Sequence, residues 1–297
     1  MEFLQDYKRP DLKAPIFLYA FAGWADAAQS ATHALQYLVK QLGATQFASL
    51  DPEEFYDFTQ ARPHTSYDGQ GNRLISWPAN DFYAWKGGPN YLDLAVFVGT
   101  EPSLRWRTFT GQIVKVVKEL GVSKVVHVGA LLDAVPHTRE PRISGTGTMP
   151  NAQAMLGGVE MRRSRYNGPT GITGVVADAF RQEGIPYVSL WGHSPHYLQV
   201  APNPKVSLSL VRAMGRVLQV DVDLEQLRSQ GKSFDRKVAQ ALTNEPEVTE
   251  YVRKLESEYD RRAAAAPGEA AAMPEPQEAV RDMEDFLKQL RGGPSVT

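Results

Sequence analysis

The segment Lys124–Met149, KVVHVGALLDAVPHTREPRISGTGTM, decides the fold class. It opens with the apolar, largely β-branched run Val125–Val128, which predicts a strand buried on both faces. A polar loop follows, and it carries Asp133, His137 and Arg139. A buried strand that ends in a polar loop is typical of α/β proteins, which display their sites at the carboxyl edge of a parallel sheet. The segment therefore predicts where a site would lie, but not what that site does.

Composition and charge narrow the class of protein. The chain has 297 residues, of which 42% are hydrophobic and 22% are charged, so it can bury a sizeable core. Its formal net charge of -2 gives no electrostatic basis for binding nucleic acid or an anionic membrane. It contains no cysteine, which excludes disulfides, thiolate metal sites and cysteine nucleophiles. The first residues lack the pattern of a signal peptide and no apolar run reaches the ~18 residues of a membrane span, so we expect a cytoplasmic protein.

Apolar strands alternate with amphipathic helices along the first two thirds of the chain. The run Pro15–Phe21 predicts a buried strand, and a helical pattern follows it from Asp26 to Leu42. Further strands are predicted at 45–50, 73–77, 93–99 and 186–190, with further helices after residue 102 and at 171–181. At least five buried strands interleaved with helices predict an α/β fold, a three-layer sandwich with a mostly parallel central sheet.

The carboxyl third of the chain is predicted to be helical, with short helices at 223–230 and 233–242 and a longer one after Glu245. Residues 263–275, AAAAPGEAAAMPE, are low in complexity and predict a flexible linker. The predicted organisation is an α/β core at 1–204, a helical subdomain at 205–262, the linker at 263–275, and a tethered amphipathic helix and tail at 276–297. The pattern leaves open whether the tethered helix folds back on its own domain or docks on another chain.

Polar side chains of the kinds used in catalysis and recognition follow several of the predicted strands. Because parallel strands end at a common rim, loops from distant parts of the sequence could form one polar cleft there, suited to general acid–base chemistry or anion binding. For Asp26, a capping role at the start of a helix is the favoured reading. The candidate residues are Trp24, Asp26, Arg62, Tyr67, Asp68, Glu101, Asp133, His137, Arg139, His196 and Tyr197.

No complete catalytic motif identifies a reaction. The phosphate-loop pattern GxxxxGK[ST], the nucleophile-elbow pattern GxSxG and the zinc pattern HExxH are all absent from the sequence. Ser194 and His196 are close in sequence, but a catalytic triad requires convergence in space and an oxyanion hole. His193 and His196 would bind a metal only if further acids met them. We therefore expect neither a metal nor another cofactor, and the catalytic residues, if there are any, remain unassigned.

Six strings of sequence carry a resemblance to a known family. They are FAGWADA at 21–27, RPHTSYDG at 62–69, GTEP at 99–102, GALLDAVPHTR at 129–139, PTGITG at 169–174 and PHYLQVAPNP at 195–204. Together, and in this order, they resemble the family named after proteasome assembly chaperone 2, over roughly residues 14–260. The chain is most similar to the actinobacterial branch of that family, in which an extra helical tail is common.

The resemblance implies an α/β fold like that of nucleoside phosphorylases and hydrolases, assembled as a homo-oligomer, with a trimer as one possibility. It also implies partners, because members of the family in eukaryotes and archaea bind 20S proteasome α-subunits and guide ring assembly without catalysing a reaction. Archaeal relatives can dock through a tail of a hydrophobic residue, a tyrosine and any residue, whereas this sequence ends in GGPSVT.

Three functions therefore remain as hypotheses. The first is a non-enzymatic assembly chaperone or protein-interaction module related to the proteasome. The second is a small-molecule site of nucleoside or phosphate type, either for binding or for a hydrolytic or phosphorolytic reaction in the strand-end cleft. The third is a homo-oligomeric scaffold whose tethered helix contacts a neighbouring copy.

Overall fold

A computed structural model describes residues 3–147, 152–156, 159–161, 167–198, 200–243 and 245–264. The predicted tethered helix at 276–297 lies outside the described residues, as does the predicted linker apart from its first two residues, which end the last described helix.

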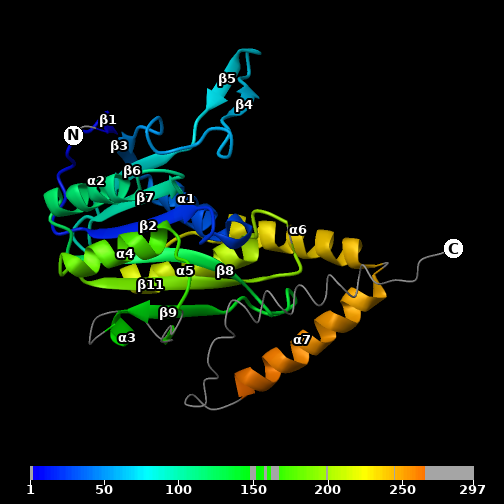
Figure 1. The fold of residues 1–297 in the computed structure, drawn as a ribbon. Helices are drawn as coiled ribbons and strands as arrows, with labels where there is room; N and C mark the ends of the chain where they lie inside the picture. The colour runs from blue at the N-terminus through cyan, green and yellow to red at the C-terminus, as the bar shows by residue number, and fades with distance from the viewer. Residues whose placement is uncertain are drawn as a thin grey trace.

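In the described residues, nine strands form one mixed sheet in the order β1-β3-β6-β7-β2-β8-β11-β9-β10 (Figure 1). The four central strands, β7, β2, β8 and β11, are parallel to one another, which confirms the predicted fold class. On either side of them, β6 and β9 pair antiparallel to the parallel centre, a feature that the sequence did not predict. The strands are β1 (Leu4–Gln5), β2 (Ile16–Ala22), β3 (Thr45–Leu50), β6 (Asn80–Trp85), β7 (Leu94–Thr100), β8 (Lys124–Asp133), β9 (Ile143–Gly147), β10 (Glu160–Met161) and β11 (Tyr187–Pro195).

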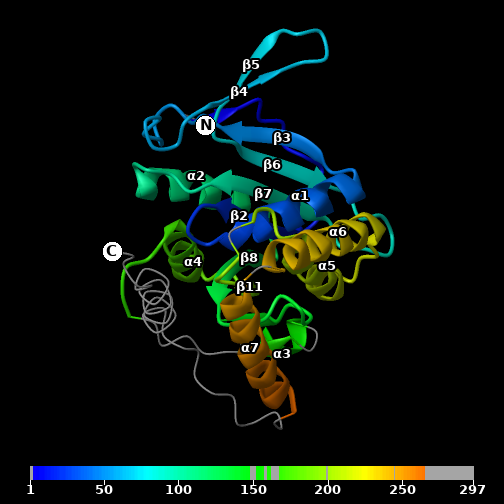
Figure 2. The ribbon, with the colours of Figure 1, turned by 90° about the vertical axis from the view of Figure 1, so that its right-hand side faces the viewer.

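Helices cover both faces of the sheet because side chains alternate along each buried strand. In β2, Ile16 and Leu18 belong to the core shared with α1 (Ser30–Leu42) and α5 (Pro204–Leu218). The intervening Phe17 and Tyr19 belong to the core shared with α2 (Trp106–Glu119) and α4 (Ile172–Gln182). Figure 2 shows the resulting three layers, with α2 and α4 on one side of the sheet and α1 and α5 on the other.

Two further helices complete the described carboxyl-terminal region. The segments predicted as two short helices form one continuous helix, α6 (Glu225–Leu242), in which Gly231 is buried beside the stem of Lys205. Helix α7 (Pro246–Ala264) follows and runs back past the loops at the carboxyl ends of β8 and β11. The short elements η1 (Ala27–Gln29) and α3 (Ala152–Met155) connect the larger ones. None of the described helices combines the length and apolarity needed to cross a bilayer.

An arm projects from the edge of the molecule (Figure 1). It is the hairpin of β4 (His64–Tyr67) and β5 (Arg73–Ser76), which pair only with each other, and every residue of both strands is exposed. The Asp68 carboxylate holds the turn by accepting hydrogen bonds from the backbone N–H groups of Gln70 and Asn72, at 2.9 and 2.8 Å. The predicted strand at 73–77 therefore exists, but it lies outside the main sheet.

One buried histidine sits in the centre of the sheet. His127 in β8 is fully buried between the rings of Tyr19 and Trp191, with centroids 4.9 and 5.0 Å away. Its Nδ1 lies 2.8 Å from Ser189 Oγ, and its Nε2 has no partner among the described residues. Burial lowers the pKa of His127 to about 3, so the ring is neutral at physiological pH.

This histidine predicts how the fold responds to acid. In the unfolded chain His127 takes up a proton near pH 6.5, whereas the folded chain resists it until about pH 3. The neutral His127 ring therefore contributes fully to the unfolding free energy above pH ~6.5. As pH falls below this value, that contribution is lost by about 1.4 kcal/mol per pH unit at most. We expect His127→Gln to flatten the dependence of unfolding free energy on pH between about 6.5 and 4. Denaturant titrations test this, with the exposed His64→Gln as control; parallel curves for His127→Gln and the parent would refute it.

Candidate functional site

The four parallel strands end at one rim. Two of the predicted acids there, Asp26 and Glu101, accept hydrogen bonds from backbone N–H groups and do not face an open cleft. Asp26 is 6% exposed, and its Oδ1 accepts hydrogen bonds from the N–H groups of Ala31 and Thr32 at 2.7 and 3.2 Å. Its other oxygen accepts from the Thr32 hydroxyl. Burial raises the pKa of Asp26, and these hydrogen bonds oppose that rise. The carboxylate thus caps the first turn of α1, as predicted.

Glu101, which follows β7, connects its own loop to the loop after β2 and to the start of α4. Its Oε2 accepts from the N–H of Trp24 at 3.1 Å, and its Oε1 accepts from the N–H of Ile172, at the start of α4, at 2.9 Å. Gly23 and Gly171 allow this close approach, because a Cβ on either would lie within 3.0 Å of Glu101 atoms. The Trp24 side chain itself is exposed.

The third rim acid, Asp133, belongs to a buried network that sequence reasoning missed. Asp133 Oδ2 lies 2.7 Å from His193 Nδ1, and His193 Nε2 lies 2.8 Å from Ser144 Oγ. Asp133 Oδ1 also accepts from the N–H of Ala134 at 2.8 Å. Burial by itself would raise the pKa of Asp133, but the hydrogen bond from His193, helped by the Ala134 N–H, lowers it overall.

The contacts of this network follow the order acid, imidazole, hydroxyl that is used by serine hydrolases. The carboxylate fixes the proton of His193 on Nδ1, so Nε2 can accept a hydrogen bond from the Ser144 hydroxyl. However, Ser144 is 2% exposed and His193 is fully buried. The adjoining cavity, which His193 helps to line, measures about 10 Å³, which is room for one water molecule. The arrangement therefore ties β8, β9 and β11 together and gives a substrate no access to Ser144.

The remaining rim residues contact one another and α7. His196 Nδ1 lies 3.0 Å from the Asp133 carbonyl, while its Nε2 lies 3.1 Å from the hydroxyl of Tyr251 in α7. The Tyr197 hydroxyl lies 2.7 Å from His137 Nδ1 and accepts from the His137 N–H at 2.8 Å. Burial lowers the pKa of His137 and raises that of Tyr197, so both groups are neutral near pH 7.

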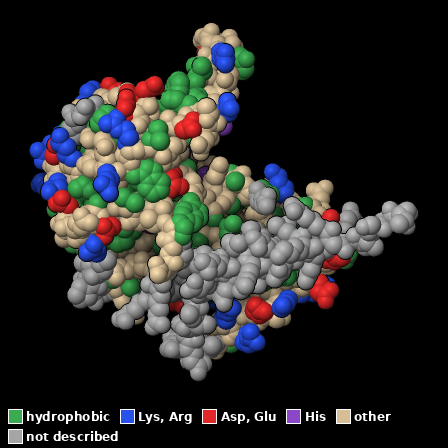
Figure 3. Space-filling view, viewed as in Figure 1, with side chains coloured by type: hydrophobic (Ala, Val, Ile, Leu, Met, Phe, Trp, Pro, Cys, Tyr) green, Lys and Arg blue, Asp and Glu red, His purple; other side chains and the backbone are tan. Residues whose placement is uncertain are grey.

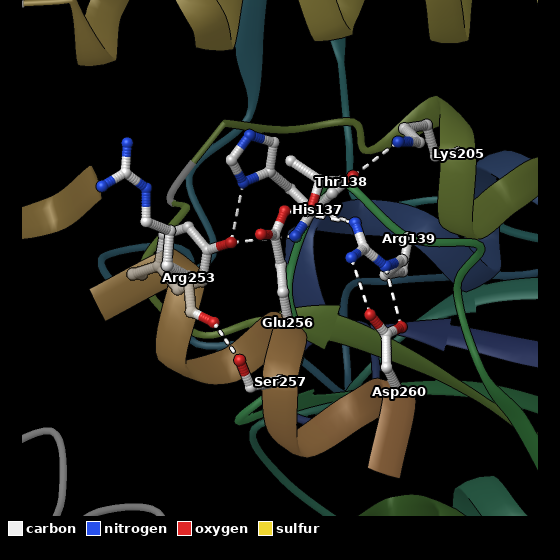
Figure 4. A network of polar contacts seen from close by, with 9 residues as sticks. His137, Thr138, Arg139, Lys205, Arg253, Glu256, Ser257 and Asp260 are labelled. Atoms are coloured by element: carbon white, nitrogen blue, oxygen red, sulfur yellow. Dashed lines mark hydrogen bonds and ion pairs between the residues drawn. The ribbon is translucent and has the colours of Figure 1, made fainter. Parts of the chain in front are cut away.

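The Arg139 side chain forms hydrogen bonds and ion pairs with acids of α7 (Figure 4). Its Nε and Nη2 donate to the two carboxylate oxygens of Asp260 at 2.9 and 2.8 Å, and its Nη1 donates to Glu256 at 3.2 Å. The hydrogen bond to Asp260 raises the pKa of Arg139 further above its ordinary value. The guanidinium thus fastens the loop after β8 to the helix, and its donors are directed at this chain's own acids rather than at an external anion.

The predicted site residues therefore fall into separate groups. Asp26 and Glu101 anchor helix starts, whereas Asp133, His137, Arg139, His196 and Tyr197 surround the loop under α7. Tyr67 and Asp68 lie on the exposed arm, and Arg62 directly precedes it. The cavity that His137 and Arg139 help to line includes none of the arm residues. Within the part of the chain that the structure describes, no group of histidine or acidic side chains is arranged to hold a metal.

These observations define a class: a three-layer α/β protein whose rim acids satisfy its own backbone and whose projecting hairpin arm is exposed and carries apolar side chains. Residues 20–242 match the model of the PAC2 family. The chain belongs to the PAC2 family, which confirms the resemblance noted in the sequence. A comparison with curated proteins gives no match.

Solved structures agree with this assignment. A PAC2 family protein from Streptomyces avermitilis is 38% identical, with 80% of this chain and 99% of that chain covered and a TM-score of 0.71. A proteasome-assembly chaperone homologue from Mycobacterium tuberculosis is 34% identical over the same shares, with a TM-score of 0.70. An archaeal proteasome activator from Pyrococcus furiosus, 21% identical over 81% of this chain and 99% of that chain, has a TM-score of 0.67 and shows the shared fold alone.

The role of Glu101 as a backbone anchor predicts the effect of a neutral substitution. In Glu101→Gln one acceptor oxygen becomes an NH₂ group that faces a backbone donor, so either the Trp24 or the Ile172 N–H loses its partner. We expect a loss of about 1–3 kcal/mol in unfolding free energy. Glu54→Gln, which removes an exposed carboxylate paired with Arg105, should cost less than about 1 kcal/mol. Urea titrations measure both, and equal losses would contradict the anchor role.

Proposed function

We propose that this protein is a non-enzymatic, proteasome-related assembly factor that works by binding protein surfaces, with proteasome α-subunits as its partners. Membership of the PAC2 family supports this role, as does the 34% identical proteasome-assembly chaperone homologue. The observation in this chain that carries the proposal is the exposed arm.

The arm is built like an element that docks on another protein. Tyr67 is 70% exposed, and Leu74, Ile75 and Trp77, which follows the arm, are about half exposed. Hydrophobic side chains are visible on the projecting arm in Figure 3. Leu74 and Ile75 are consecutive in β5, so they face opposite sides, and both faces of the arm carry apolar surface. A hairpin of two strands has no core and is marginally stable in water. A partner surface would bury these side chains and order the arm.

The alternative of a small-molecule or hydrolytic site at the strand ends has less support. The cavity beside His193 has a volume of about 10 Å³, whereas small-molecule sites measure roughly 300–1,000 Å³.

The assembly role also requires a cytoplasmic location, because the protein has to reach newly made α-subunits.

Native mass spectrometry of the full chain mixed with 20S α-subunits from its own host tests the proposal. We expect a complex at micromolar concentration, and Tyr67→Ser combined with Ile75→Ser should weaken it about tenfold or more, because both residues offer apolar area on the arm. Tyr91→Ser, which removes an exposed aromatic ring from another loop, is the matched control and should leave the complex intact. No complex with the parent chain over the micromolar range would overturn the proposed partner.

We also propose that the chain forms a homo-oligomer, as the family resemblance implies, with a trimer as the expected state. The same instrument measures this on the protein alone: the trimer has three times the 32.9 kDa mass of one chain. A single species at the mass of one chain, at the concentration used for the α-subunits, would contradict it.

A further inference from the structure

The two faces of the arm differ in the side chains that they carry. In the pairing of β4 with β5, Thr65 lies opposite Ile75 and Tyr67 lies opposite Arg73. Because side chains alternate along each strand, these four residues share one face, which we call the Tyr67 face. Leu74 lies on the opposite face. The Tyr67 face therefore combines an aromatic ring, a branched apolar side chain and a guanidinium.

The guanidinium on this face has no opposite charge beside it. Arg73 donates to the Thr65 hydroxyl at 3.3 Å and forms no ion pair with an acid in the part of the chain that the structure describes. The nearby carboxylate of Asp68 is occupied by the turn of the hairpin, where it accepts from the N–H groups of Gln70 and Asn72. Arg73 can therefore pair with an acid that another segment brings.

A hairpin of this kind needs a cover. Two strands become stable in water when a third strand or a helix packs against them. Strands β4 and β5 pair only with each other, and none of their residues belongs to the buried clusters of the described core. A cover for the Tyr67 face would thus have to come from outside the described residues.

The carboxyl-terminal tail of the chain has the size and pattern of such a cover. Its sequence at 276–290 predicts an amphipathic helix whose apolar stripe would span about 16 Å, while four strand residues span about 13 Å. The segment contains four acids and two basic residues, and Asp282 precedes Phe286 by one helical turn, so it borders the stripe. The stripe consists of Val280, Met283, Phe286, Leu287 and Leu290.

The position of α7 favours the tail of a neighbouring copy. The Tyr259 hydroxyl donates to the Glu140 carbonyl at 2.8 Å, so the last turns of α7 lie beside the segment that leads into β9. In the sheet, β9 lies five strand positions from β6, which the arm precedes, and this separation is about 24 Å. A flexible linker of residues 265–275 spans about 17–20 Å on average. The arm projects beyond the sheet, which adds to the separation (Figure 1).

We propose that segment 276–290 of one copy packs as a helix across the Tyr67 face of a neighbouring copy. The apolar stripe covers Tyr67 and Ile75, and Asp282 pairs with Arg73. The contact joins two different surfaces, so it repeats from copy to copy and can close a ring such as the proposed trimer. The inference rests on the proposed homo-oligomer and does not require α-subunits, which would displace the tail when they bind the same face.

Engineered disulfides test this contact, because the chain has no cysteine of its own. In the full chain, Thr65→Cys on the Tyr67 face is combined with Met283→Cys on the apolar stripe. Mild oxidation should link one copy to the next, so a denaturing gel should show covalent species of two and three chains.

Two matched pairs serve as controls for the disulfide. Ser66→Cys with Met283→Cys uses the opposite face of the arm, and Thr65→Cys with Arg281→Cys uses the polar side of the predicted helix. Both control pairs should link at least about tenfold more slowly, because their sulfur atoms point away from the contact.

A charge reversal tests the ion pair within the same contact. Arg73→Glu sets two carboxylates against each other and should slow the linking of Thr65→Cys with Met283→Cys about tenfold. Asp282→Arg in the same chain should restore the rate. Arg62→Glu, at an exposed arginine that precedes the arm, is the control and should leave the rate unchanged.

The outcomes separate this contact from the other proposals. A link formed only within single chains would overturn the neighbouring copy as the source of the tail, and equal rates in the test and control pairs would overturn the contact itself. A trimer in native mass spectrometry without the link would keep the homo-oligomer and remove this contact. A link between copies without an α-subunit complex would keep the contact and remove only the proposed partner.

Discussion

Backbone N–H groups at the carboxyl rim of the parallel sheet need acceptors, and three acids supply them. Asp26 serves the start of α1, Glu101 joins Trp24 to the start of α4, and Asp133 holds the turn after β8 while orienting His193. A hydrogen bond to a charged group contributes about 1.5–3 kcal/mol, so these carboxylates are already used by the fold before any ligand is considered. The rim where an α/β enzyme would keep its chemistry is used here for structural support.

With the rim used in this way, the proposed docking surface lies at the edge of the molecule. The arm of β4 and β5 extends beyond the sheet. Apolar side chains on this exposed hairpin provide area that suits recognition of a protein surface. Arg139 fastens helix α7 to the loop that follows β8, next to the buried network of Asp133, His193 and Ser144.

The sequence predicted the parallel centre of the sheet because its strands are apolar on both faces and are separated by amphipathic helices. It did not predict the arm as a separate element, because a short polar strand such as His64–Tyr67 has no buried face and so no alternation to detect. It also missed the contact of Ser144 with His193, which depends on the antiparallel pairing of β9 with β11 across 49 positions of sequence. For Asp26 the helical pattern that follows was a sufficient signal of capping.

We propose that the protein binds its partners with the arm, while the rim supports the fold. Hydrogen–deuterium exchange of the chain with and without bound α-subunits tests this directly, because protection reports which backbone segments the partner covers. Binding through the arm predicts slower exchange at residues 64–77 and no change at 22–26 and 133–139. Protection of the rim segments with an unchanged arm would contradict it.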